Sequence, residues 1–100
     1  MQQKYVDGSN GLSVRQLKIL TFIQRYSETF GYAPTVRDIR DSLEISSTSV
    51  VGSDLRMLRR GGFINSQYRA ARTVSLTQNG LNLLWKENYA GPDTAAKVQG

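Results

Sequence analysis

The sequence predicts a mainly α-helical fold that carries one small β-hairpin. Three segments have apolar residues at helical spacing, and each follows a Ser or Thr that can cap a helix. These segments are 14–30, 36–43 and 48–60. A glycine pair, Gly61-Gly62, then stops the third helix. The apolar start of a strand at Phe63-Ile64 and the alternating segment 73–76 flank a basic loop, which is typical of a hairpin.

The first helix is expected to begin after Ser13 and to run to about Phe30. Ser13 and Gln16 form a capping box, which satisfies two free amide groups at a helix start. Gly31 can take the left-handed conformation that ends a helix. The predicted apolar stripe contains Leu17, Leu20, Ile23 or Tyr26, and Phe30, and Ile19 and Phe22 widen it. A stripe this wide indicates a central helix that contacts several neighbours.

A short second helix is expected directly after Ala33-Pro34, because proline disfavours helix at the residue before it. Thr35 is its predicted N-cap, and Asp38 is the partner in a weaker capping box. Ile39 and Leu43 stand four residues apart, so they share the buried side of this helix.

A turn over residues 44–46, with Ile45 as its apolar plug, leads to Ser47, the predicted N-cap of a third helix that runs to about Arg60. At 100° per residue, one narrow sector of this helix holds Val51, Leu55 and Leu58. The opposite side holds Ser49, Ser53, Arg56 and Arg60. Because its exposed front half carries small side chains, the helix can sit deep in a groove.

The hairpin loop runs from Asn65 to Arg72 and is basic, with Tyr68, Arg69 and Arg72 near its tip. Thr77 is the predicted cap of a fourth helix, whose apolar side holds Leu81, Leu84 and Trp85, with Leu83 flanking. This order of elements is that of a winged helix-turn-helix, a three-helix bundle plus wing that lays one helix in the DNA major groove. Here an extra C-terminal helix follows the wing.

A chain of 100 residues is expected to form a single domain. We expect a flexible N-terminal arm at 1–11, the winged-helix domain at 12–89 with its last helix at 77–89, and a disordered tail at 90–100. The start of the sequence lacks the apolar core of a signal peptide, and no apolar run is long enough to span a membrane. A cytoplasmic location fits these features.

The charge pattern predicts a polyanionic partner. The net charge is +5, and seven of the 13 basic residues, all of them arginine, lie between Arg37 and Arg72. Arginine matches phosphates and guanine edges better than lysine does. The sequence has no cysteine and no histidine, so zinc sites of that type, disulfides and histidine catalysis are excluded. We expect no cofactor, no metal and no enzymatic activity.

From Leu12 to Ile64 the chain resembles the N-terminal DNA-binding domain of the LexA family, the repressors of the SOS response. The matching residues are Leu12-Ser13-Val14-Arg15-Gln16, Gly31-Tyr32-Ala33-Pro34-Thr35, Asp38-Ile39, Leu43, Ser47, Leu55, Leu58 and Gly62-Phe63-Ile64. The resemblance implies a third helix that reads the major groove. The positions that align with the base contacts of the family are Ser47, Ser49, Val50, Gly52 and Ser53.

Other residues are expected to contact phosphates or the minor groove. They are Thr35, Arg37, Arg40, Arg56, Arg60, Arg69 and Arg72. For Arg37 and Arg40 a solvated charge is an equal alternative, and a wing arginine can also be part of a mobile loop tip. Tyr68 either stacks on or bonds to DNA, or packs on its own hairpin.

The chain also departs from the family. LexA proteins carry asparagine and glutamates where this chain has Ser49, Gly52 and Ser53, so the usual operator of the family is not carried over to this chain. Glu44 occupies a turn position where the family prefers glycine. LexA proteins also continue into a self-cleaving, dimerising domain with a serine–lysine dyad, which these 100 residues do not contain.

Two questions stay open at this level. The side of the fourth helix with Leu81, Leu84 and Trp85 either packs on the first helix or forms a homodimer interface, and the need for a second half-site favours the dimer. The favoured function is a regulator of transcription that binds double-stranded DNA sequence-specifically, and repression is favoured over activation. The alternative is a winged-helix module that binds another protein.

Overall fold

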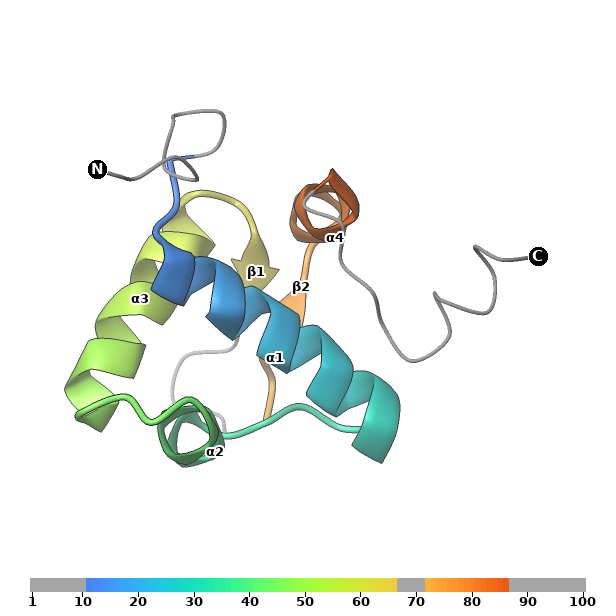
Figure 1. Ribbon diagram of the computed structural model, residues 1–100. Coiled ribbons are helices and arrows are strands. Elements are labelled where there is room, and N and C mark those ends of the chain that lie inside the picture. The colour runs from blue at the N-terminus through green and yellow to red at the C-terminus, as the bar shows by residue number, and fades with distance from the viewer. Residues whose placement is uncertain (1–10, 67–71, 87–100) are drawn as a thin grey trace.

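The computed structural model describes residues 11–66 and 72–86. Its elements are α1 (Val14–Phe30), α2 (Val36–Ser42), α3 (Thr48–Arg60), β1 (Ile64–Asn65), β2 (Ser75–Leu76) and α4 (Gln78–Lys86). Helix α1 crosses the centre of the molecule, with α3 on the left, α4 on the right, α2 below and the small hairpin behind (Figure 1). This arrangement confirms the winged helix-turn-helix with a fourth helix.

Several predictions lie outside the described residues. They concern most of the N-terminal arm at 1–11, Tyr68 and Arg69 in the wing, the end of the helix at 77–89, and the tail at 90–100. No helix of the described residues is both long enough and apolar enough to cross a membrane.

The helix starts follow the predicted caps. In α1 the Ser13 hydroxyl accepts a hydrogen bond from the Gln16 amide (3.1 Å), and the Gln16 side chain accepts one from the Ser13 amide (3.1 Å). In α2 the amide of Asp38 donates to the Thr35 hydroxyl (3.0 Å), and the Thr35 amide donates to the Asp38 carboxylate (2.9 Å). Both capping boxes are therefore complete, which fixes where each helix begins.

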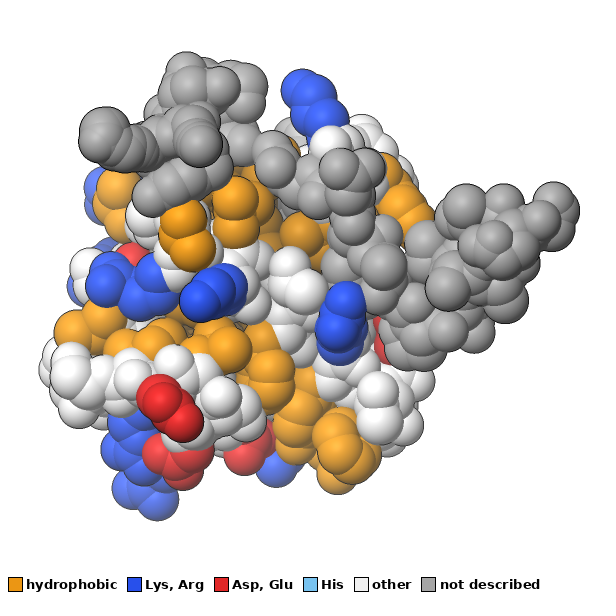
Figure 2. Space-filling view, in the orientation of Figure 1, with side chains coloured by type: hydrophobic (Ala, Val, Ile, Leu, Met, Phe, Trp, Pro, Cys, Tyr) orange, Lys and Arg blue, Asp and Glu red, His pale blue; other side chains and the backbone are white. Residues whose placement is uncertain are grey.

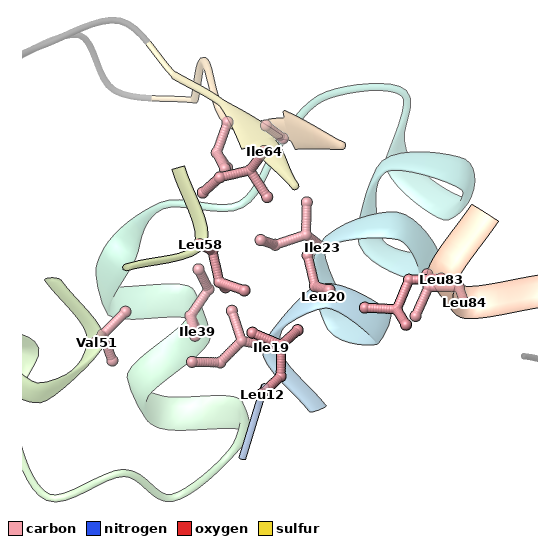
Figure 3. Packing of buried hydrophobic residues seen from close by; sticks show 12 residues of the cluster. Leu12, Ile19, Leu20, Ile23, Ile39, Val51, Leu58, Ile64, Leu83 and Leu84 are labelled. Carbon is pink, nitrogen blue, oxygen red and sulfur yellow. The ribbon is translucent and has the colours of Figure 1, made fainter. Parts of the chain in front are cut away.

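One buried apolar cluster joins α1, α2 and α3. Ile19 from α1, Ile39 from α2 and Leu58 from α3 are fully buried members of this cluster, and Figure 3 shows the three side chains close together. Ile64 of the hairpin extends the cluster behind α1, and Leu84 extends it towards α4. The shared core therefore packs α3 against α1 and α2.

One apolar assignment is corrected, and one of two open alternatives is confirmed for Leu84. Phe30, expected on the buried stripe of α1, is 52% exposed, because the last turn of α1 projects beyond the core and its ring packs on Tyr26 and Tyr32 instead. Leu84, expected on a surface that either packs inward or forms a dimer, is 2% exposed, and its neighbour Leu83 is also buried. The inward-packing alternative therefore describes these two leucines.

The hairpin is shorter than the segments that predicted it. Each strand has two residues, paired antiparallel with Ile64 opposite Leu76. The Thr77 hydroxyl donates to the carbonyl of Gly62 (2.6 Å) and accepts from the amide of Gly80 (3.1 Å). A β-carbon on Gly80 would lie 2.3 Å from the Phe63 carbonyl oxygen, so this glycine lets α4 pack directly against the start of the hairpin.

Candidate nucleic-acid interface

Helix α3 presents an exposed face with small side chains at its front and arginines behind. Ser47 is its N-cap, and the Ser47 hydroxyl accepts a hydrogen bond from the amide of Val50 (3.2 Å). Past the cap the exposed residues of this face are Ser49, Ser53, Arg56 and Arg60. Near the start of α3, at the lower left of Figure 2, the surface is mainly white, with hydrophobic side chains above it and Asp or Glu side chains beside it.

Gly52 leaves room in the middle of this face. A β-carbon built on it would have no heavy atom within 4 Å in the protein itself. Nothing inside the fold therefore requires glycine here, although glycine lowers helix stability by roughly 1 kcal/mol relative to alanine. Val50 and Gly52 are both half-buried, so the five positions that align with the base contacts of the family range from half-buried to exposed.

The buried side of α3 contains a charged residue that the helical pattern missed. Val51 and Leu58 are fully buried as predicted, but Leu55 is only half-buried, and Asp54 beside it is 3% exposed. Arg15 of α1 reaches both carboxylate oxygens of Asp54, from Nε at 2.5 Å and from Nη2 at 3.1 Å. The side-chain amide of Gln16 donates a third hydrogen bond to the Asp54 carboxylate, at 3.2 Å.

This ion pair joins the front of α1 to the buried side of α3. The hydrogen bond from the guanidinium to Asp54 raises the pKa of Arg15 above its ordinary value. A sequence signal for the pair did exist, because Asp54 stands three residues after Val51 and four before Leu58. An acid at that spacing points towards the neighbouring helices and needs a cationic partner there.

The turn between α2 and α3 contains a residue in an unfavourable conformation. Glu44 has φ +55°, the left-handed region that glycine adopts easily. The amide of Ile45 donates to the Arg40 carbonyl (2.9 Å) and that of Glu44 to the Asp41 carbonyl (3.4 Å). These are the bonds of a Schellman motif, so the turn keeps this geometry with a glutamate in place of glycine.

Around α2, the predicted phosphate contacts have different surroundings. Arg37 is exposed and makes no ion pair or hydrogen bond with any residue that the structure describes. Arg40 instead donates from Nε to Asp41 (2.8 Å), and this hydrogen bond raises the pKa of Arg40. Thr35 is half-buried and uses its hydroxyl oxygen as the helix cap. Of these three residues, Arg37 is the one most available to an outside phosphate.

The wing arginines are not equivalent either. Arg69 lies outside the described residues, whereas Arg72 lies at the base of the wing with its side chain 41% exposed. Its Nη1 atom donates to the carbonyl oxygen of Ala33 (2.8 Å) and lies 3.5 Å from the carboxylate of Asp38. The expectation that Arg72 contacts the minor groove or a phosphate stays a prediction, and its guanidinium already has partners within the chain.

The fourth helix offers less apolar surface than its pattern suggested. Leu81 is half-buried and Leu84 is inside the core, while Trp85 is 56% exposed. Of the residues predicted for a dimer interface, Trp85 therefore contributes most of the exposed surface.

The fold and this surface agree with a family relationship. The sequence model of the LexA DNA-binding domain family matches residues 9–73 of this chain. The LexA repressor of Roseiflexus sp. is 44% identical over 68 residues, which cover 68% of this chain and 31% of that protein. That of Herpetosiphon aurantiacus is 45% identical over 67 residues, 67% of this chain and 31% of the relative.

A longer alignment reaches past the hairpin. The LexA repressor of Anaeromyxobacter dehalogenans is 34% identical over 90 residues, which cover 90% of this chain and 39% of the relative. The chain thus spans about a third of the length of the curated relatives that it matches. With a family match across well over half of its residues and the winged helix-turn-helix fold, the chain belongs to the LexA DNA-binding domain family.

Proposed function

We propose that this domain binds double-stranded DNA sequence-specifically and acts in a transcriptional repressor by occupying an operator. Helix α3, with its cap at Ser47, lies in the major groove, where Ser49, Gly52 and Ser53 face the base edges. The wing, residues 65–72, lies at the adjacent minor groove, and Arg37, Arg56 and Arg60 bind phosphates.

The supporting observation is the absence of internal partners along one face of α3. Ser49 and Ser53 are exposed, Gly52 has empty space before it, and Arg56 and Arg60 form no ion pair within the described residues. Because no described part of the fold binds these side chains, the face is available to a partner. Small side chains followed by arginines suit a phosphate-walled groove, and the relatives named above are LexA repressors.

A selection of bound oligonucleotides from a random pool, at physiological salt, tests the proposal directly. Recovery of one enriched motif is expected, and recovery of random sequence would contradict sequence-specific binding. Homodimeric binding predicts an inverted repeat whose half-sites lie about 10 base pairs apart, or a multiple of that distance. A single half-site would instead indicate a monomer, and it would leave Trp85 without the interface role proposed for it.

The substitution Gly52→Ala separates the role of Gly52 in DNA binding from its role in folding. The free domain should become more stable by up to about 1 kcal/mol, because alanine favours helix and has room in the fold. Binding to the selected motif should nevertheless weaken, because the added methyl group occupies the closest approach to the groove. The matched control is Ser42→Ala at the end of α2, which should leave affinity unchanged. Unchanged affinity for Gly52→Ala would place α3 outside the groove.

A further inference from the structure

Arg72 is the centre of a small network that joins three parts of the chain. Besides bonding the Ala33 carbonyl, its Nη1 atom lies 3.4 Å from the hydroxyl of Tyr26, and that hydroxyl donates to the Asp38 carboxylate at 3.2 Å. The guanidinium carbon also lies 4.8 Å from the centre of the Tyr32 ring, a cation–π distance. The hydrogen bond to Tyr26 and the nearby Asp38 raise the pKa of Arg72.

These contacts link the wing to the helix-turn-helix. Tyr26 belongs to α1, Tyr32 and Ala33 form the connection after it, and Asp38 is the capping-box partner of Thr35 at the start of α2. In Figure 1 the chain that enters β2 runs down to this connection. One side chain thus ties the returning limb of the wing to a point 39 residues earlier in the sequence.

The backbone of Arg72 supports the same conclusion. Its φ is +57°, a left-handed value that a side chain other than glycine adopts at a cost. Such a conformation persists when the surrounding contacts determine it. If the guanidinium left to reach DNA, the buried Ala33 carbonyl would lose the hydrogen bond from Nη1, and the exposed Tyr32 ring would lose the cation on its face.

We propose that Arg72 is a positioning residue for DNA binding: it sets the wing against the start of α2 and does not itself bind a phosphate. The inference rests on the proposed function, and it assigns to Arg72 a role different from that of Arg56. Both residues are arginines of one protein, so the same measurement can separate the two roles.

The test is the salt dependence of binding to the selected motif. Each phosphate contact that is lost should reduce the slope of log Kobs against log salt concentration by about 0.9. Arg56→Ala should show that reduction. Arg72→Ala should weaken binding while the slope stays that of the wild type, because the number of neutralised phosphates does not change. A slope reduced by about 0.9, or an affinity equal to that of the wild type, would overturn the proposal.

A conservative variant sharpens the result. Arg72→Lys keeps a positive charge, which is enough for a phosphate, but lacks the planar fork and the stacking surface. Failure of lysine to restore affinity is expected, whereas full rescue would indicate a phosphate contact. Tyr32→Leu should weaken binding without removing any cation, and combining it with Arg72→Ala should add little, since both changes break the same network. Full additivity of the two changes would contradict a shared network.

A measurement on the free protein keeps this inference separate from DNA binding. Amide hydrogen exchange in Arg72→Ala should show reduced protection at β1 and β2, with protection of α3 retained. Unchanged protection of both strands would refute the positioning role even if the wild type bound no specific DNA. Reduced strand protection in a protein without a selected motif would support the link between wing and α2 and count against the proposed function alone.

Discussion

Two arginine–aspartate pairs, one at the front of α1 and one at the back between the wing and the start of α2, differ mainly in the burial of the carboxylate. At the front, Arg15 binds Asp54 of α3, whose side chain is 4% exposed. At the back, Arg72 lies 3.5 Å from Asp38, whose side chain is 32% exposed. Water screens the second pair and is excluded from the carboxylate of the first. The front pair should therefore govern folding stability, while the back pair should govern geometry at the wing.

The largest effect is expected from Arg15→Ala. Removing the arginine leaves the Asp54 carboxylate buried with the Gln16 amide as its one remaining side-chain partner among the described residues, and it should cost about 2–3 kcal/mol of unfolding free energy. That value lies below the usual range for a broken buried pair because the Arg15 side chain is 51% exposed, so water can enter in its place. Urea denaturation followed by circular dichroism measures the loss.

The matched variant is Asp54→Ala, which should cost only about 1 kcal/mol. It removes the buried charge along with its desolvation cost and leaves an arginine that water can solvate. If Asp54→Ala proves more destabilising than Arg15→Ala, burial of the carboxylate is not what makes the front pair strong.

A stabilising substitution that alters neither ion pair gives a reference for the changes in unfolding free energy expected at the two pairs. Glu44→Gly should raise the unfolding free energy by about 0.5–1 kcal/mol, because glycine adopts the left-handed turn conformation without strain but loses more entropy on folding. Glu44→Gln removes the charge and keeps the strain, so it should leave stability unchanged. Equal gains from both variants would mean that charge, and not backbone strain, limits the turn.

The smallest effect should appear in acid. The hydrogen bond from the Thr35 amide, with smaller contributions from Tyr26 and Arg72, lowers the pKa of Asp38 below its ordinary value of 3.8. A lowered folded-state pKa means that Asp38 contributes its full stability above that ordinary value and loses it as the pH falls through the folded-state pKa.

Urea denaturation at several pH values between 7 and 3 tests this contribution. The wild type should lose more unfolding free energy below about pH 4 than Asp38→Asn does, because asparagine has no proton to take up. Curves that stay parallel down to pH 3 would show that Asp38 contributes nothing through ionisation.

The contrast between the pairs also explains which features the sequence could predict. The helix caps, the glycine stop and the buried positions Ile39, Val51 and Leu58 follow from local spacing, and the structure has them where they were expected. The two ion pairs join residues 39 and 34 positions apart in the sequence, a separation that no periodic pattern encodes.

The predicted interface shows the same division. The exposure of Ser49, Ser53 and Arg56 follows from the angular position of each residue on α3. The orientation of Arg72 does not, because it depends on an aromatic ring and a carbonyl supplied by the α1–α2 connection. A basic residue in a loop is thus ambiguous from sequence until its neighbours in space are known.

The open space before Gly52 makes the chain convenient for chemical mapping. These 100 residues contain no cysteine, so Gly52→Cys would carry the sole thiol among them. A photoactivatable cross-linker attached there would report every nucleotide that passes in front of α3, base pair by base pair, without competing attachment sites. Because Gly52 has no side chain, a label attached at this position fits without displacing any neighbour and can react with a molecule bound in front of it.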